Sequence, residues 1–146
     1  MTGPRWLDST IVLDIHAEQL ALFGGADGVR DLGLLDSALG RPLYKFGYGE
    51  TNLAVLAAAY AFGIARNHPA VDGNKRTAFA SIVVFLGLNR LEFAPSPEAA
   101  TAIIFSLASG EITEADLARW IEENIVAPSR RRRHRIDPGK ARQRDS

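Results

Sequence analysis

The chain has 146 residues, a formal net charge of zero and no cysteine. This length suits a single domain with its own core, and the lack of cysteine excludes disulfides and zinc sites built from thiolates. The N-terminal residues lack the apolar stretch of a secretion signal, and the longest apolar runs, 53–65 and 77–88, are shorter than the ~20 residues that span a bilayer. We therefore expect a cytoplasmic protein without membrane contact.

The zero net charge conceals an uneven distribution. Residues 128–146 hold eight Lys or Arg and two Asp, whereas residues 1–127 hold nine basic and fifteen acidic side chains. Blocks of charge at a terminus are typical of solvated, disordered tails and also of arms that bind nucleic acid. The sequence predicts a folded domain over 1–127 and a basic, disordered tail over 128–146, with nucleic-acid contact as the alternative role of the tail.

Helical patterns follow one another along the chain. The first predicted helix covers residues 9–23 and stops at a pair of glycines. The second starts near residue 31 and ends before Pro42, because a proline disfavours helical backbone at the residue before it. Residues 44–49 are then expected to form an aromatic, glycine-rich loop.

Two central helices are expected next, over residues 51–66 and 74–88. Both are apolar around their whole circumference, which is typical of helices buried on all sides. Four small residues would let these two helices approach closely: Ala59, Gly63, Ala78 and Gly87.

A fifth helix starts at Ser96 and Pro97, a cap followed by a proline in the first helical position. The last starts with a capping-box pattern at Thr113 and Asp116 and is predicted to bury residues as far as Ile125. The fold predicted is all-α, a compact six-helix bundle around two apolar central helices.

Residues 68–76, His-Pro-Ala-Val-Asp-Gly-Asn-Lys-Arg, carry the densest group of reactive side chains. The imidazole of His68 can take a proton from a hydroxyl near neutral pH. Asp72 can cap the helix that follows or, together with substrate phosphates, bind Mg²⁺. Gly73 permits a positive φ, and Asn74 can either orient the loop or contact a phosphate.

Lys75 and Arg76 lie in the first turn of the predicted helix over 74–88. Cations at a helix N-terminus oppose the helix dipole, so their placement is more easily understood if an anion binds there. The segment matches neither a Walker A loop nor a kinase glycine loop. By themselves, these residues predict phosphate handling beside a general base.

The same nine residues resemble the signature of the Fic/Doc family, which reads His-x-Phe-x-Asp-Ala/Gly-Asn-Lys-Arg in its Doc (death-on-curing) branch. The similarity extends to residues 28–42, 57–68 and 109–112, and covers roughly residues 7–125. It implies an all-α fold and a Doc toxin of a toxin–antitoxin pair. The implied partner is a small antitoxin whose C-terminal segment occupies the active-site groove.

The resemblance also implies roles for single residues. His68 matches the catalytic base that activates a Ser or Thr hydroxyl, and Asp72 matches the Mg²⁺ ligand. The phosphates of ATP would be bound by five further residues: Arg66, Gly73, Asn74, Lys75 and Arg76.

Two reactions remain open. Fic enzymes, with Gly where this chain has Lys75, transfer AMP from ATP, whereas the Doc branch is expected to transfer the γ-phosphoryl group to a translation factor, elongation factor Tu.

The chain departs from the signature at Ala70, where the family has Phe. Unless a neighbouring side chain such as Phe62, Phe79 or Phe85 fills that space, the chain is expected to be a catalytically weak relative. No Ser or Thr is followed four residues later by Glu, the mark of an inhibitory helix within the chain, so inhibition is expected from a separate antitoxin.

Overall fold

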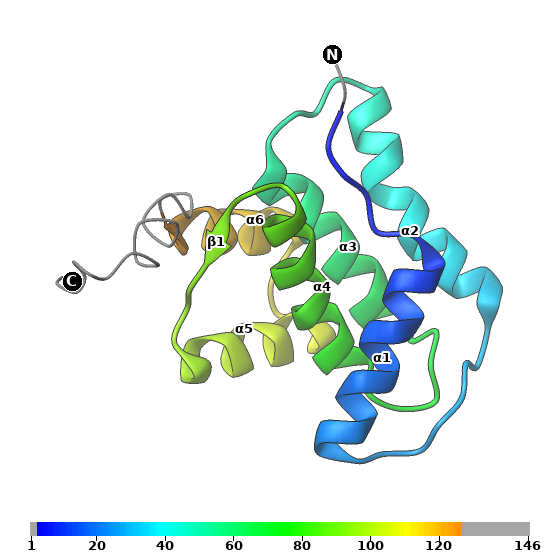
Figure 1. Ribbon diagram of the computed structural model, residues 1–146. Helices are drawn as coiled ribbons and strands as arrows, with labels where there is room; N and C mark the ends of the chain where they lie inside the picture. Colours follow the sequence, from blue (N-terminus) through cyan, green and yellow to red (C-terminus); the bar gives the residue numbers. More distant parts are fainter. Residues whose placement is uncertain (1–2, 127–146) are drawn as a thin grey trace, which may run out of the picture.

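The computed structural model describes residues 3–126, which form six helices and one short antiparallel pair of strands (Figure 1). In chain order they are α1 (Ser9–Phe23), α2 (Leu32–Gly47), α3 (Leu53–Asn67), α4 (Asn74–Leu88), β1 (Glu92–Phe93), α5 (Pro97–Ser109), α6 (Glu114–Glu123) and β2 (Ile125–Val126). The predicted all-α bundle is confirmed. The predicted tail over 128–146 lies outside the described residues. Within residues 3–126, no helix combines the length and the apolar character needed to cross a bilayer.

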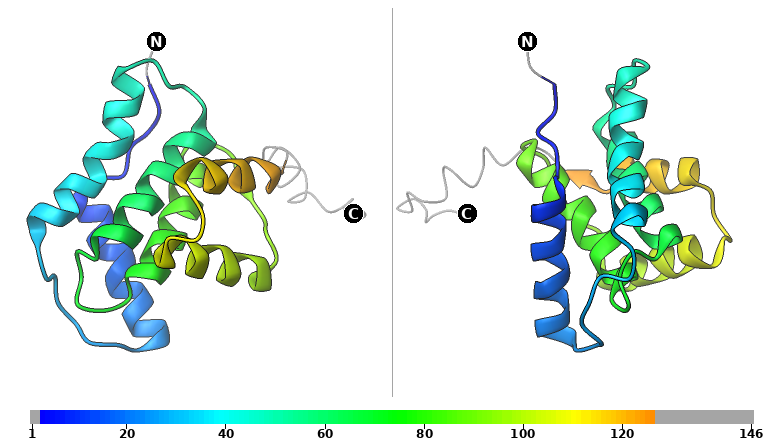
Figure 2. Two further views of the ribbon diagram at one scale, coloured as in Figure 1. Left: turned by 180° about the vertical axis from the view of Figure 1, so that it is seen from behind. Right: turned by 90° about the vertical axis from the view of Figure 1, so that its right-hand side faces the viewer.

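Helix α3 is the centre of the bundle, as its uniform apolarity predicted. Ten of its fifteen residues are buried, and it packs most extensively on α2 and α4 and then on α6. Helices α1 and α6 lie on opposite sides of the α3–α4 pair (Figure 2). The buried Tyr60 hydroxyl accepts a hydrogen bond from the Leu7 N–H at 2.9 Å, which ties the segment before α1 to the core. Burial raises the pKa of Tyr60 to about 12.

Helix α4 is less enclosed than its sequence suggested. One face is buried through Ile82, Phe85 and Leu86, whereas Gly87 lies at the surface with no atom near the position of a Cβ. A Cβ on Gly63 would lie 2.8 Å from the Ala38 Cα, so this glycine permits the close approach of α3 to α2 rather than to α4.

The prediction that the second helix ends before Pro42 was wrong. Helix α2 continues through the proline to Gly47 because its buried stripe runs on at helical spacing, from Leu35 to Pro42. Tertiary packing therefore outweighs the lost backbone hydrogen bond. Residues 44–47, expected as a loop, form the last turn of α2, at the end farthest from the connection between α3 and α4 (Figure 1).

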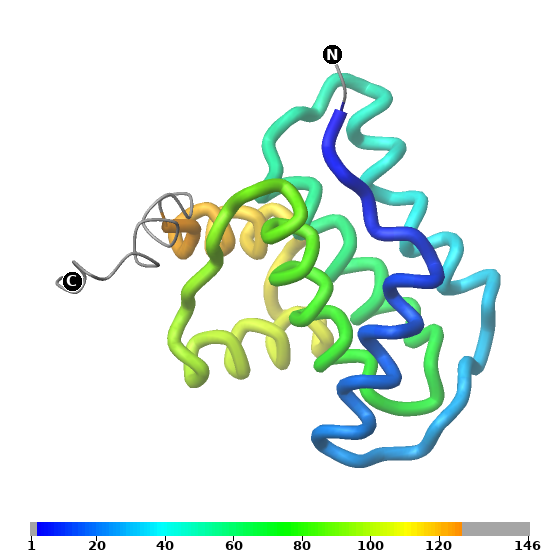
Figure 3. Tube along the Cα trace, in the orientation of Figure 1, coloured from blue at the N-terminus to red at the C-terminus, as the bar shows by residue number. Residues whose placement is uncertain are grey.

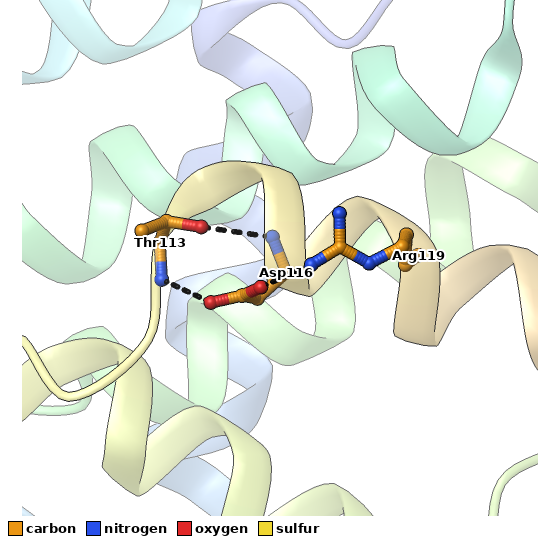
Figure 4. A network of polar contacts seen from close by, with 3 residues as sticks. All are labelled: Thr113, Asp116 and Arg119. Atoms are coloured by element: carbon orange, nitrogen blue, oxygen red, sulfur yellow. Dashed lines mark hydrogen bonds and ion pairs between the residues drawn. The ribbon is translucent and has the colours of Figure 1, made fainter.

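Five helices begin with a side chain that accepts a hydrogen bond from a first-turn N–H: Asp8, Asp31, Asn52, Ser96 and Thr113. At α6 the predicted capping box is present, with Arg119 paired to Asp116 beside it (Figure 4). Helix α6 ends at Glu123, so Ile125 lies in β2 opposite Phe93 and not in the last helix as predicted. Helix α4 has no side-chain cap.

Candidate active site

The loop over residues 68–73 connects the end of α3 to the start of α4 and lies against the connection between α1 and α2 (Figure 3). The two segments pair through backbone hydrogen bonds from Val71 N–H to the Gly28 carbonyl at 3.1 Å and from Arg30 N–H to the Pro69 carbonyl at 2.7 Å. Val29 and Ala70 thus form an isolated antiparallel bridge. A loop of mostly small and polar residues is held in place by a segment some forty positions earlier in the chain.

The loop and the first turn of α4 surround one open pocket. Its walls contain six of the seven residues that the sequence predicted for the site: His68, Asp72, Gly73, Asn74, Lys75 and Arg76. A base, a carboxylate and two cations therefore face a common volume. Arg66, the remaining predicted site residue, does not line this pocket; its guanidinium lies over the Phe62 ring, 5.4 Å from the centroid.

His68 follows the last residue of α3 in a left-handed backbone conformation, with φ of 50° and ψ of 57°. Such a conformation is uncommon for a residue with a Cβ and marks a position that the surroundings enforce. The side chain is exposed, and within residues 3–126 its ring has neither a hydrogen-bond partner nor a charged partner. The imidazole is therefore free to receive a proton.

Asp72 does not cap α4, and that interpretation was wrong. Its Oδ1 accepts from the Gly73 N–H at 2.9 Å and its Oδ2 from the Ala26 N–H at 3.3 Å. These two backbone bonds, with the charges of Arg76 and Lys75, lower the pKa of the carboxyl. The group is exposed, ionised at neutral pH and retains oxygen lone pairs for a cation.

Gly73 occupies the N-cap position of α4 with φ of 79°, as its glycine suggested, and contributes no side chain. The first-turn N–H groups of α4 therefore belong to an uncapped helix end, and the residues that carry them line the pocket. Together with the helix dipole, they form a site suited to an anion.

The side chains of Asn74, Arg76 and Lys75 differ in their contacts. The Asn74 amide bonds both the N–H and the carbonyl of Ala70, at 3.0 and 2.9 Å, so it orients the loop. Arg76 donates to the Gly24 carbonyl at 3.0 Å and lies over the Phe23 ring. Lys75 is exposed and lines the pocket, and no hydrogen bond or ion pair to another residue of the part of the chain that the structure describes holds its side chain away.

Sequence reasoning missed His16. This buried residue of α1 lies with Nε2 2.7 Å from the Asp72 carbonyl, so Nε2 carries the donated proton. It links α1 to the motif across fifty-six positions. A single histidine on an amphipathic helix offers no sequence signal for such a contact.

The space beside Ala70 has been filled by aliphatic side chains. A residual cavity of about 20 Å³, room for about one water, lies between α1, α3 and α4. Its walls include Val12, Val29, Leu35 and Ile64, and none of the three phenylalanines considered above. The buried Thr77 Oγ1, which has no hydrogen-bond partner within the described residues, belongs to the same wall.

We expect Ala70→Phe to destabilise the protein rather than restore the family residue. A benzyl group far exceeds the cavity, so the Val29–Ala70 bridge must open, at a cost of about 1–3 kcal/mol. Urea unfolding measures the change, with Ala17→Phe on the exposed face of α1 as control. An unchanged unfolding midpoint for Ala70→Phe is the contrary result.

A second hollow extends from Lys75 and Arg76 along α5. It has a volume of about 470 Å³ and is lined by apolar side chains that include Phe23, Phe79 and Phe105. No group of three or more His, Asp or Glu suited to a metal ion exists among residues 3–126.

Comparison with known proteins identifies the family of this chain. The profile of the Fic/DOC family matches residues 6–86. The "Protein kinase doc" of Escherichia phage P1 is 33% identical over 115 residues, which cover 78% of this chain and 90% of that protein. The "Toxin Doc" of Mycolicibacterium smegmatis is 48% identical over 75 residues, 49% of this chain and 57% of that protein. The chain belongs to the Fic/DOC family.

Proposed function

We propose that this protein is a Doc-like toxin that transfers the γ-phosphoryl group of ATP to a Ser or Thr hydroxyl of a translation factor and thereby arrests translation. The observation that carries the proposal is the one uncapped helix N-terminus among residues 3–126, at α4, with His68 and Lys75 on the walls of the same pocket. The names of the two relatives, a protein kinase and a toxin, support the same reading. Such chemistry belongs in the cytoplasm.

In the proposed reaction, the target hydroxyl oxygen forms a bond to the γ-phosphorus while the bond from that phosphorus to the β,γ-bridging oxygen breaks. The hydroxyl proton passes to the imidazole of His68, and ADP leaves. Lys75, Arg76 and the first N–H groups of α4 stabilise the phosphate oxygens. Catalysis therefore consists mainly of positioning and charge stabilisation.

The carboxylate of Asp72 suits the proposed role of a Mg²⁺ ligand. Its carboxylate is exposed, its pKa is lowered, and within the described residues each oxygen accepts one backbone N–H. Mg²⁺ is commonly held by one or two carboxylates with phosphate oxygens and water, so a single Asp suffices. When bound, the ion neutralises charge on the phosphates and orients them.

ATP labelled at either the α- or the γ-phosphate tests the reaction. The full chain is incubated with Mg²⁺, labelled ATP and purified elongation factor Tu, and label retained on the factor is counted. Label from the γ position alone supports the kinase. Label from the α position identifies AMP transfer, and no label from either position contradicts both reactions.

We further propose that the hollow beside α5 receives the C-terminal segment of a cognate antitoxin. It offers two cations at one end and exposed phenylalanines along its length, which suits a peptide with acidic and apolar side chains. Occupation of this hollow would cover Lys75 and Arg76 and so block the phosphate site. Co-expression with the antitoxin is expected to relieve growth arrest.

Phe105→Glu is expected to weaken antitoxin binding at least about 10-fold, because it places a carboxylate in an apolar contact. Phe105 is 63% exposed, so the substitution leaves the core intact. Calorimetric titration measures the affinity, with Leu43→Glu on the exposed face of α2 as the matched control. Equal affinities of Phe105→Glu and the unchanged chain would place the antitoxin elsewhere.

A further inference from the structure

We propose that Arg30 is a positioning residue that fixes the catalytic base through its backbone; the inference rests on the proposed role of His68. The Arg30 guanidinium donates to the His68 carbonyl from Nε at 3.0 Å and from Nη2 at 2.7 Å. The same Nη2 donates to the Asn67 carbonyl at 3.1 Å. One planar group thus binds the two carbonyls at the end of α3.

These carbonyls need an external donor. The last carbonyls of a helix have no partner within the helix and lie at the negative end of its dipole, where a cation is favoured. The backbone of His68 also needs stabilising contacts, because its left-handed conformation is strained for a residue with a Cβ. Hydrogen bonds from a guanidinium to the His68 carbonyl stabilise that conformation and with it the direction of the Cα–Cβ bond.

Within residues 3–126, no hydrogen bond or ion pair fixes the ring of His68 itself. Its backbone N–H bonds the Ile64 carbonyl at 3.3 Å, and the imidazole itself has no partner. The position of the base relative to Lys75 therefore depends on the backbone of residue 68. Arg30 provides the only side-chain hydrogen bonds to that backbone among the described residues.

Arg30 is itself firmly placed. The N–H groups of Arg30 and Asp31 both donate to the Pro69 carbonyl, at 2.7 and 3.0 Å. Asp31 caps α2, and the Asn67 side chain donates to the Leu34 carbonyl at 3.0 Å. These bonds fix the backbone that carries Arg30 against the end of α3. The segment 28–42, which resembles the family, thereby gains a role.

The test compares Arg30→Lys with Arg119→Lys. Lysine keeps the charge but lacks the planar fork that reaches two carbonyls. For Arg30→Lys we expect kcat to fall about 10- to 100-fold with KM for ATP unchanged, because the phosphate site stays intact. Arg119, on α6 and paired with Asp116, lies outside the site and serves as control (Figure 4). Assays are run where urea unfolding shows every variant to be fully folded.

Two further readouts separate positioning from general loss of structure. NMR of labelled protein is expected to show shifted backbone and ring resonances of His68 in Arg30→Lys and none in Arg119→Lys. Guanidinium ion, far below denaturing concentration, is expected to restore part of kcat to Arg30→Ala but none to His68→Ala.

The outcomes for Arg30 and for the reaction are distinguishable. Unchanged His68 resonances in Arg30→Lys overturn the inference, whether or not the protein is an enzyme. An active wild-type protein whose Arg30→Lys variant keeps its kcat also overturns it. A wild-type protein that transfers no label contradicts the proposed function instead, while the NMR comparison still decides the role of Arg30.

Discussion

Replacing His68 by alanine or asparagine is expected to lower γ-phosphoryl transfer about 100- to 10,000-fold, the usual contribution of a general base. The free energy of unfolding should change little, because the ring is exposed and has no partner within residues 3–126. Asparagine is the sharper variant, since it tolerates the left-handed backbone that residue 68 adopts. Single-turnover transfer and urea unfolding measure the two quantities.

This prediction also separates the enzyme from a binding module that arrests growth by occupying its target. If His68→Asn arrests growth as strongly as the unchanged chain and binds the same target, catalysis is not the cause of toxicity. A parallel loss of transfer and of growth arrest assigns both to the imidazole. Ala17→Asn, on the exposed face of α1, controls for the introduction of the amide.

The parts of the fold that follow local rules could be predicted from the sequence. Ser96 with Pro97 and Thr113 with Asp116 specify helix starts through hydrogen bonds within a few residues, and both starts are where the sequence placed them. Pro42 shows the limit of such rules. The packing of α2 on α3 decides that the helix continues, and this contact joins residues far apart in the chain.

The candidate site shows the same division. His68, Asp72, Lys75 and Arg76 were predictable because one short segment holds them all, and the structure places them around one pocket. Arg66 is only two residues from His68 in sequence, yet its side chain lies over Phe62, because these two residues are four apart on one face of α3, whereas His68 follows the end of the helix.

The contacts that hold the site were not predictable. His16 reaches the Asp72 carbonyl from α1, and Arg30 reaches the His68 carbonyl from the connection before α2. In both cases the acceptor is a backbone carbonyl, which every residue has, so no pairing of residue types in the sequence marks the contact. The proposed catalytic group comes from one short segment of the chain, whereas the residues that contact its loop come from distant segments.

Asp72→Asn is expected to lower Mg²⁺-dependent transfer by about 100-fold or more, because an amide replaces the anionic ligand and the stabilisation lost amounts to several kcal/mol. The asparagine keeps one acceptor, so one of the two backbone bonds, to Gly73 or to Ala26, persists. The loop should therefore survive while the metal site is lost. Transfer measured against Mg²⁺ concentration gives the affinity of each protein for the ion.

The pH dependence of stability separates the structural role of Asp72 from its role toward Mg²⁺. Its pKa is lowered in the folded protein, so the ionised carboxyl stabilises the fold above its unfolded pKa of about 3.9. That contribution is lost as the pH falls through the lower pKa of the folded state. Without metal, the wild-type protein should be more stable than Asp72→Asn at neutral pH and approach it in acid. Asp27→Asn, in the same connection as Ala26, is the control. If Asp72→Asn keeps full Mg²⁺-dependent transfer although it lacks the carboxylate, a group other than Asp72 holds the ion.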